Sequence, residues 1–392
     1  MKIYLVGGAV RDKLLGLPVK EQDYVVVGAT PNEMLDMGFR QVGKEFPVFL
    51  HPKTNEEYAL ARMERKVKPG YKGFTFDTSP RVTLEEDLVR RDLTINAMAI
   101  DPDTGSLIDP YHGKQDLDHK ILKHVSPAFA EDPVRILRLG RFYARYAHLG
   151  FTVAPITIEL MRDMVKAGEV DALVAERVWK ELERALSEQN PEKFFEVLDE
   201  CGALAKLFPG LDVKGTGMQA LIAAAESSNS PAIRFSALLH DLPDPRKSII
   251  ALCNRYRVPN DYRELALLTA QHFQAALDFK TLSADEILNL LGTLDYFRRE
   301  ERFYKFLAAV KAIDASRRKK LFKSFKTVDA SDEFDPRHLI EAAQVSKQES
   351  AKQIREFIAQ GIEGRELAEK IRKTRLEIIE NFFAGQGQNM HK

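Results

Sequence analysis

The sequence predicts an α+β protein in which a small mixed-sheet head domain precedes an all-helical remainder. Runs rich in β-branched residues at 3–6 and 25–27 predict strands that alternate with helical segments near the N-terminus. From residue 151 onward, apolar residues recur at helical spacing. The chain has 392 residues, more than one typical domain holds, so we expect about two to four domains.

Charge and cysteine content narrow the compartment and the partners. The 58 Lys and Arg residues balance 58 Asp and Glu residues, so a nucleic-acid partner must be sought in local basic patches. Cys201 and Cys253 give neither a disulfide framework nor a zinc spacing, which favours a reducing cytoplasm. No apolar run has membrane-spanning length, and the first strand leaves no room for a signal peptide. We expect a cytoplasmic protein with no membrane contact and no obligate protein partner.

The N-terminal stretch combines a glycine pair with an arginine. The strand at 3–6 ends at Gly7 and Gly8, which let the backbone turn tightly and bring N–H groups close to a ligand. A helix is predicted over 10–15, so the glycines lie at its positive end, which suits phosphate. Arg11 adds a charged fork for phosphate oxygens.

Two carboxylates precede the next strand. Glu21 and Asp23 stand just before the run at 25–27, and side chains at i and i+2 of a strand share a face. Carboxylates beside a phosphate cradle match Mg²⁺-assisted phosphoryl chemistry. Each piece alone is common in surface loops, so the prediction rests on their order and spacing. We therefore take Glu21 and Asp23 as candidate catalytic residues and metal ligands.

These segments together resemble the first motif of the nucleotidyltransferase superfamily, in the branch shared by bacterial tRNA CCA-adding enzymes and poly(A) polymerases. That motif reads G-G-x-V-R-D followed by D-x-D. Glu21 stands where the family usually has Asp, and its extra methylene moves the carboxylate oxygens by roughly 1.5 Å. The sequence R-R-D-L-T-I-N-A at 90–97 also resembles the family, which implies that Arg91 contacts the nucleotide while Asp92 pairs or binds the sugar.

The rest of the head domain is expected to complete a small sheet with helices on one side. Thr30 and Pro31 predict the start of a short helix. Strands are expected within 41–62. Residues 63–87 show no sustained period and are expected to form a long loop. In the resembled family a flexible loop here is needed for the final adenosine, so its presence favours full CCA addition over CC addition.

A basic helix follows. Asp132 predicts an N-cap, and Arg135, Arg138 and Arg141 recur every three or four residues. A solvated helix face is the ordinary interpretation of such a stripe. An acceptor and a donor one turn apart, however, suit both cytosine and adenine, which present an exocyclic amine beside an acceptor ring nitrogen. The motif E-D-x-x-R resembles the family's, which implies that Asp132 and Arg135 read the base and that Arg138 and Arg141 hold the incoming nucleotide.

The C-terminal half carries three weaker signals. The apolar spacing at 174–186 resembles the family's neck motif and is interpreted as packing. His240 and Asp241 suggest an HD phosphohydrolase domain, but only the distant His272 follows, so we expect a structural relic. The cations at 317–326 form either a solvated face or a contact to the tRNA backbone.

The resemblance implies template-free addition of the 3′-terminal CCA to tRNA, from CTP and ATP, with Mg²⁺ as cofactor. In the implied mechanism Glu21 and Asp23 hold the metal ions, and Gly8, Arg11 and Arg91 secure the triphosphate while diphosphate leaves. The implied domains are a catalytic head at 1–140, a neck for nucleotide selection at 141–210, a body with the HD relic at 211–330, and a tail that contacts tRNA at 331–392.

Other functions stay open from the sequence. The chain can be a partial enzyme that adds only CC or only A, or a poly(A) polymerase. It can also be an RNA-binding protein whose catalysis has decayed, for which Glu21 is the clue. A stand-alone helical scaffold is disfavoured by the intact set of Arg91, Asp132 and Arg135.

Overall fold

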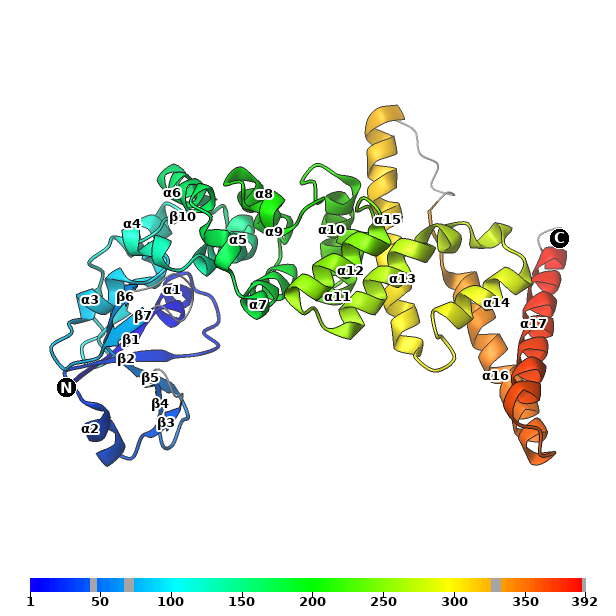
Figure 1. Ribbon diagram of the computed structural model, residues 1–392, viewed down its shortest axis with the longest axis horizontal. Coiled ribbons are helices and arrows are strands. Elements are labelled where there is room, and N and C mark those ends of the chain that lie inside the picture. The colour runs from blue at the N-terminus through cyan, green and yellow to red at the C-terminus, as the bar shows by residue number, and fades with distance from the viewer. Residues whose placement is uncertain (43–47, 67–73, 326–332, 390–392) are drawn as a thin grey trace. The chain divides into compact units, whose positions relative to one another are not determined.

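The computed structural model describes residues 1–42, 48–66, 74–325 and 333–389. The chain divides into two compact units, Met1–Pro209 and Gly210–Lys392 (Figure 1). Strands occur at the start of the first unit and helices make up most of the rest, which confirms the predicted fold class. The finer division at residues 140, 210 and 330 stays a prediction.

A seven-stranded mixed sheet in the order β3-β4-β5-β2-β1-β8-β9 forms the centre of the head. β1 runs antiparallel to β2, with Val6 opposite Asp23, and β2 runs parallel to β5, with Asp23 beside Glu57. The end of β1 therefore meets the starts of β2 and β5 at one edge of the sheet. The strands are β1 (Lys2–Val6), β2 (Asp23–Val27), β3 (Arg40–Val42), β4 (Val48–Leu50), β5 (Glu57–Leu60), β8 (Ala99–Ile100) and β9 (Leu107–Ile108).

Both faces of this sheet are covered by helices, so the expectation of helices on one side is wrong. Val25 packs in one cluster with Leu88 of α3 (Leu84–Val89), whereas Val26 packs in another with Met34 of α2 (Pro31–Asp36). The apolar run in β2 is continuous because neither face meets water, and continuous runs are typical of strands buried on both sides.

Capping residues and a glycine turn mark where the helices of the head begin. Thr30 accepts from the Glu33 N–H and Glu33 accepts in return, a complete capping box that begins α2. The helix α1 (Gly8–Leu14) begins two residues earlier than expected, directly after Gly7. Gly7 has φ of 69°, in the left-handed region that favours glycine.

The segment 63–87 is not one long loop. β6 (Met63–Lys66) and β7 (Phe74–Asp77) pair as an antiparallel hairpin, and α3 begins at Leu84 after a capping box at Thr83. Residues 67–73, in the middle of the predicted loop, lie outside the described residues. A pattern within one strand does not record its pairing with another strand, which is why the hairpin was missed.

After the short helix α4 (Gly113–Asp118), the helices α5 to α9 complete the first unit beyond the sheet. Gly140 lets α5 approach α8 closely, because a Cβ there would lie 2.9 Å from Phe194 Cδ2. α5 also packs on α7. These contacts turn the arginine-bearing face of α5 toward the sheet edge described above. The helices are α5 (Val134–Tyr146), α6 (Pro155–Lys166), α7 (Ala175–Leu186), α8 (Glu192–Glu200) and α9 (Ala203–Leu207).

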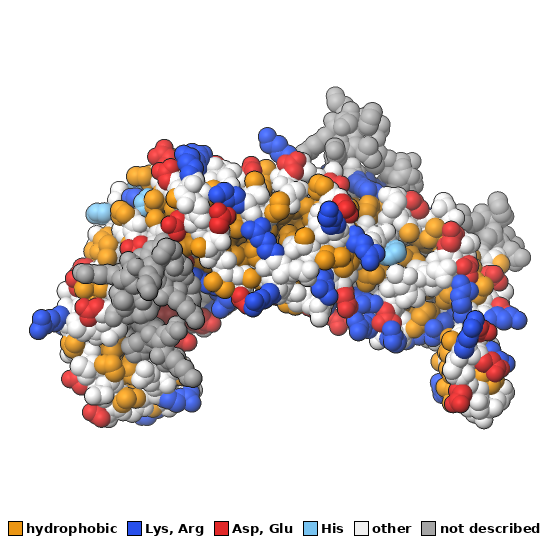
Figure 2. Space-filling view, in the orientation of Figure 1, with side chains coloured by type: hydrophobic (Ala, Val, Ile, Leu, Met, Phe, Trp, Pro, Cys, Tyr) orange, Lys and Arg blue, Asp and Glu red, His pale blue; other side chains and the backbone are white. Residues whose placement is uncertain are grey.

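The second unit consists of helices and the turns that connect them, with no strand among its described residues. α10 packs on α11 and α15, with small side chains such as Ala220 and Ala312 in the core, and α16 packs along α17. On the face shown in Figure 2, Lys and Arg side chains are interspersed with Asp and Glu over these helices. The longer helices are α10 (Thr216–Ser227), α11 (Pro231–Leu239), α12 (Pro245–Tyr256), α13 (Asn260–Leu277), α14 (Ala284–Thr293), α15 (Glu300–Phe325), α16 (Arg337–Ala359) and α17 (Gly364–Asn389).

The HD-like residues form ordinary packing contacts. His240 is buried, bonds through Nδ1 to the Ala237 carbonyl and meets the Phe273 ring edge-on. Asp241 accepts from the Thr216 hydroxyl. Within the described ranges, no group of three His, Cys, Asp or Glu side chains is placed to hold a metal ion, and no helix is long and apolar enough to cross a membrane.

The predicted basic run at 317–326 is only partly visible. Arg317 lies over the Phe273 ring, 4.7 Å from its centroid, and Lys319 pairs with Glu226 at 2.8 Å. The side chains from residue 320 to the end of this run lie outside the described residues. A tRNA contact here stays a prediction.

Candidate active site

A pocket of about 1190 Å³ lies within the first unit. Among the described residues, ten arginines and five carboxylates line it, a formal excess of five positive charges, so it suits an anionic ligand. All nine residues predicted from the sequence line this one pocket, and none lies elsewhere. They are Gly8, Arg11, Glu21, Asp23, Arg91, Asp132, Arg135, Arg138 and Arg141.

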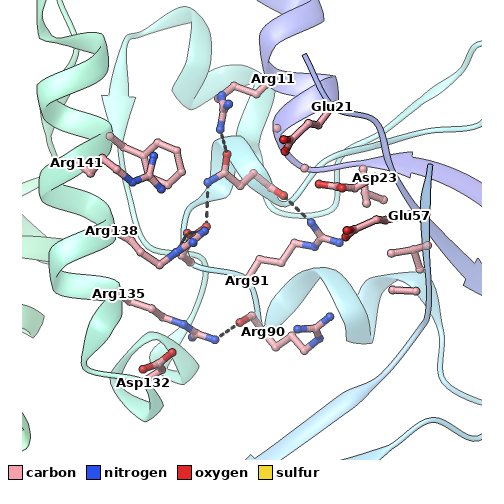
Figure 3. Close-up of a pocket in the computed structure, with 18 of the residues that line it drawn as sticks. Arg11, Glu21, Asp23, Glu57, Arg90, Arg91, Asp132, Arg135, Arg138 and Arg141 are labelled. Carbon is pink, nitrogen blue, oxygen red and sulfur yellow. Dashed lines mark hydrogen bonds and ion pairs between the residues drawn. The ribbon is translucent and has the colours of Figure 1, made fainter. Parts of the chain in front are cut away.

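Carboxylates form one wall of the pocket. Glu21, Asp23 and Glu57 lie together on the strand side, opposite the arginines of α5 (Figure 3). Enclosure by the pocket walls raises the pKa of Asp23, the Arg91 guanidinium opposes this effect, and the Glu21 carboxylate adds to it. Sequence reasoning missed Glu57, which reaches the wall because β5 pairs in register with β2. The available signal in the sequence was that Glu57 is a charged residue at the start of a strand predicted to be half-exposed.

This wall fits a hard divalent cation. Its donors are carboxylate oxygens, which Mg²⁺ prefers. In the part of the chain that the structure describes, no three His, Cys, Asp or Glu side chains lie close enough together to hold a metal ion by themselves. Mg²⁺ commonly takes one or two carboxylates and completes its shell with substrate phosphates and water, so Glu21 and Asp23 could hold it together with a nucleotide.

The glycine turn sits between two guanidinium groups. A Cβ on Gly7 would lie 2.9 Å from Arg91 Nη1, and a Cβ on Gly8 would lie 3.3 Å from Arg11 Nη2. A side chain at position 7 would therefore force Arg91 to shift, and one at position 8 would make a tight contact with Arg11. Arg11 is only 3% exposed, and its guanidinium carbon lies 5.2 Å from the ring centroid of Phe142. The turn and the two cations have the chemistry that a phosphate group requires.

Asp87 holds the arginine pair Arg90 and Arg91 in place. It was not identified from the sequence. It is fully buried and accepts from Arg90 Nη2 at 2.5 Å and from Arg91 Nη2 at 3.1 Å. Burial alone would raise the pKa of Asp87, but the charges of the two arginines outweigh it and the pKa is lowered. The spacing of Asp87 from both arginines, one helical turn, was the available signal.

Asp92 pairs with an arginine, as one of its two predicted roles required. Its Oδ2 accepts from Arg138 Nε at 2.8 Å and Nη2 at 2.6 Å. Its Oδ1 accepts from the Leu93 N–H at 2.8 Å and from Asn96 Nδ2 at 2.9 Å. Burial opposes ionisation, but Arg138 and these donors lower the pKa of Asp92. Both oxygens are thus held by the protein itself.

The two residues expected to read the base lie at one end of the pocket, each oriented by other groups. Asp132 accepts the Val134 N–H at 3.2 Å, and α5 begins one residue later than expected. Arg177 of α7 binds both Asp132 oxygens. Arg135 donates to the carbonyls of Ala128 and Arg90, at 2.6 Å each.

The interpretation of 174–186 as packing alone is incomplete. Val178 and Leu182 are in the core, but Arg177 and Arg184 line the pocket. Between them Glu181 is buried and accepts from Arg141 Nε at 2.6 Å. Charged residues at i, i+4 and i+7 of one helix were the signal, because they share a face.

Two family models match the chain. The poly A polymerase head domain matches residues 3–123, and a probable RNA and SrmB-binding site of polymerase A matches residues 150–214. A CCA-adding enzyme of Coxiella burnetii is 54% identical over 335 residues, covering 84% of this chain and 88% of the relative. This chain belongs to the CCA-adding enzyme family. A multifunctional CCA protein of Teredinibacter turnerae is 50% identical and covers 97% of both chains.

Solved structures of the family share the fold. A CCA-adding enzyme in complex with ATP is 21% identical, with a TM-score of 0.68, and covers 96% of this chain and 86% of that one. The Thermotoga maritima CCA-adding enzyme complexed with tRNA is 22% identical, with a TM-score of 0.66, covering 98% and 91%. α5 lies between the two ranges that the family models match. The positions of its arginines therefore come from the structure and not from a family model.

Proposed function

We propose that this chain adds the 3′-terminal CCA to tRNA, without a nucleic-acid template, from CTP and ATP, and releases diphosphate. One observation carries the proposal beyond family membership. A single pocket contains a carboxylate wall, a glycine turn between two guanidinium groups, and the acid–arginine pair of α5. Its volume exceeds the range of about 300–1,000 Å³ typical of small-ligand sites, which leaves room for a nucleotide and the end of an RNA chain.

Phosphoryl transfer is assigned to the wall and the turn. Glu21 and Asp23 would hold Mg²⁺, which would supply positive charge to the triphosphate and activate the attacking 3′-hydroxyl. Glu57 adds negative charge to the same wall. Gly8 presents its backbone N–H to the phosphates, and Arg91 and Arg11 supply the positive charge that the departing diphosphate needs.

Base selection is assigned to the start of α5. The Asp132 carboxylate accepts from the exocyclic amine of cytosine or adenine, and Arg135 donates to the neighbouring ring nitrogen. Uracil and guanine present a carbonyl and a ring N–H at these positions. The Asp132 carboxylate would then face another acceptor, and Arg135 would face another donor. Arg138 and Arg141 hold the nucleotide from the same helix face.

The activity is tested with tRNA transcripts that end before CCA, at C or at CC, with Mg²⁺ and labelled CTP or ATP. We expect two C residues and then one A, with loss of incorporation in Asp23→Ala. Asp163→Ala is the matched control, since its side chain is 74% exposed on α6. Addition of one nucleotide type only would indicate a partial enzyme, and a run of A residues would indicate a poly(A) polymerase.

A weak enzyme that chiefly binds RNA is the second candidate, because Glu21 replaces the usual Asp. Glu21→Asp separates the two. A large gain in rate would indicate a decayed site, and no gain would indicate that Glu21 is a working ligand. Buried, free Cys201 and Cys253 support action in the reducing cytoplasm. Contact of residues 331–392 with tRNA is part of the same proposal.

A further inference from the structure

Asn96 joins two arginines that stand on different walls of the pocket. Arg11 Nη1 donates to Asn96 Oδ1 at 2.5 Å, and Asn96 Nδ2 donates to Asp92 Oδ1 at 2.9 Å. The other oxygen of Asp92 binds Arg138. A continuous chain of hydrogen bonds therefore runs from α1 to α5 (Figure 3). Asn96 is 6% exposed, so water competes little for these bonds.

The orientation of the Asn96 amide follows from its neighbours. A guanidinium can only donate, and an ionised carboxylate can only accept. The amide oxygen must therefore face Arg11 and the amide nitrogen must face Asp92. An amide can accept on one side and donate on the other whatever the pH. An ionised aspartate lacks the donor, and leucine has neither group.

We infer that Asn96 is a positioning residue that makes Arg11 and Arg138 act as one nucleotide-binding unit. It acts through the two arginines and not through the base, so CTP and ATP binding depend on it alike. The inference rests on the proposed function, because it takes a nucleoside triphosphate as the ligand of the pocket. It assigns a role to the asparagine four residues after Asp92.

Replacing the amide by a carboxyl gives the inference a signature in pH. In Asn96→Asp, the introduced carboxyl would face Asp92 within hydrogen-bond distance, and two carboxylates this close compete for one proton. When protonated, the introduced carboxyl donates to Asp92 and the chain of hydrogen bonds is complete. When ionised, it repels Asp92 and this chain of hydrogen bonds is broken. The charged groups that face this position are Arg11 and its partner Asp12, Arg91 through the Asn96 carbonyl, Asp92, and Arg138 through Asp92.

The experiment measures the dissociation constants of CTP and ATP by calorimetry for the full chain, from weakly acidic to weakly alkaline pH. Each value is divided by the wild-type value at the same pH, which cancels titration of the nucleotide. For Asn96→Asp we expect binding about 10- to 100-fold weaker at alkaline pH, in line with the loss of hydrogen bonds to charged groups. This deficit should shrink as the pH falls. Asn96→Leu should bind weakly at every pH.

The second unit offers a matched control. Asn289 Nδ2 donates to Asp285 Oδ2 at 3.0 Å, and its Oδ1 accepts from Arg372 Nη2 at 3.0 Å. This exposed asparagine thus bridges an acid and an arginine in the same way, and Asn289→Asp should bind both nucleotides as the wild type does. Recovery of Asn96→Asp in a single sample on acidification also shows that the variant is folded.

Three results would overturn the inference alone. The first is wild-type affinity of Asn96→Asp at alkaline pH, and the second is weakened binding that does not recover as the pH falls. The third is a deficit confined to one nucleotide. If the wild type binds neither CTP nor ATP, the proposed function fails and the inference fails with it.

Discussion

Arg177 and Asp132 form a two-pronged ion pair, with Nη1 3.1 Å from Oδ1 and Nη2 2.7 Å from Oδ2. The planar guanidinium fixes the plane of the carboxylate as well as its charge. Asp132 precedes α5 whereas Arg177 comes from α7, so a second helix determines how the acid faces the pocket.

Arg177→Lys should weaken base selection. Lysine keeps the charge but not the fork, so the Asp132 carboxylate can rotate. We expect the ratio of kcat/KM for CTP to that for UTP to fall about tenfold, as for the loss of one hydrogen bond to a charged group. Single-nucleotide incorporation assays measure this ratio. Arg162→Lys, an arginine on α6 paired with Glu200, is the control, and an equal fall there would refute the role of Arg177.

Gly7→Ala should remove nucleotide binding, whereas Gly16→Ala should not. Their φ angles are 69° and 67°, so alanine costs each position about 1–2 kcal/mol in backbone strain. Only at Gly7 does the added Cβ meet Arg91, because no atom lies within 4 Å of a Cβ on Gly16. Thermal unfolding should show similar losses of stability, and CTP titration should separate the two variants. Equal affinities would mean that Arg91 moves aside without consequence.

Asp87→Asn should destabilise the first unit strongly. Removing one partner of a buried ion pair typically costs about 3–5 kcal/mol, because Arg90 and Arg91 lose their counter-charge. The pKa of Asp87 lies below its ordinary value of 3.8, so its contribution is complete above that value and is lost as the pH falls through the lowered one. Urea unfolding at neutral pH measures the difference.

An exposed pair calibrates that result. Asp118 is 58% exposed and pairs with Lys114 one helical turn away, so Asp118→Asn should change stability by only about 0.3–0.5 kcal/mol. If Asp87→Asn costs no more than this, the buried pairs contribute little.

Asp23→Asn should abolish catalysis without lowering stability at neutral pH. The pKa of Asp23 is raised in the folded chain, chiefly by burial. A group of this kind favours folding below its unfolded pKa, and that contribution is lost as the pH rises through the folded pKa. The uncharged amide removes the penalty at neutral pH, so the thermal midpoint should stay equal or rise. Added Mg²⁺ and CTP should raise the midpoint of the wild type more than that of the variant.

Local chemistry explains what the sequence could predict. A strand that ends in two glycines, carboxylates at i and i+2, and arginines at helical spacing are each defined by neighbouring residues, and Arg11, Asp23 and Arg138 all reach the pocket. Glu57 and Arg177 could not be found in this way. Their positions depend on the pairing of β5 with β2 and on the packing of α7 against α5.

The same limit explains the errors in the head. Coverage of the sheet on both faces, and the pairing of β6 with β7, depend on contacts between segments distant in the sequence. Asp92 could be predicted in part. The sequence indicated that its carboxylate has a partner, but only the fold shows that this partner is Arg138.

β1 pairs on one side with β2 and on the other with β8, where Val6 meets Ala99. During translation β1 therefore waits for a neighbour, β8, that emerges much later. A nascent chain that stops before β8 has the glycine turn and Asp23 but exposes one edge of β1, and unpaired edges invite association with other chains. Domains generally fold as units once their sequence is complete. β1 is thus paired on both sides only after β8 has been made.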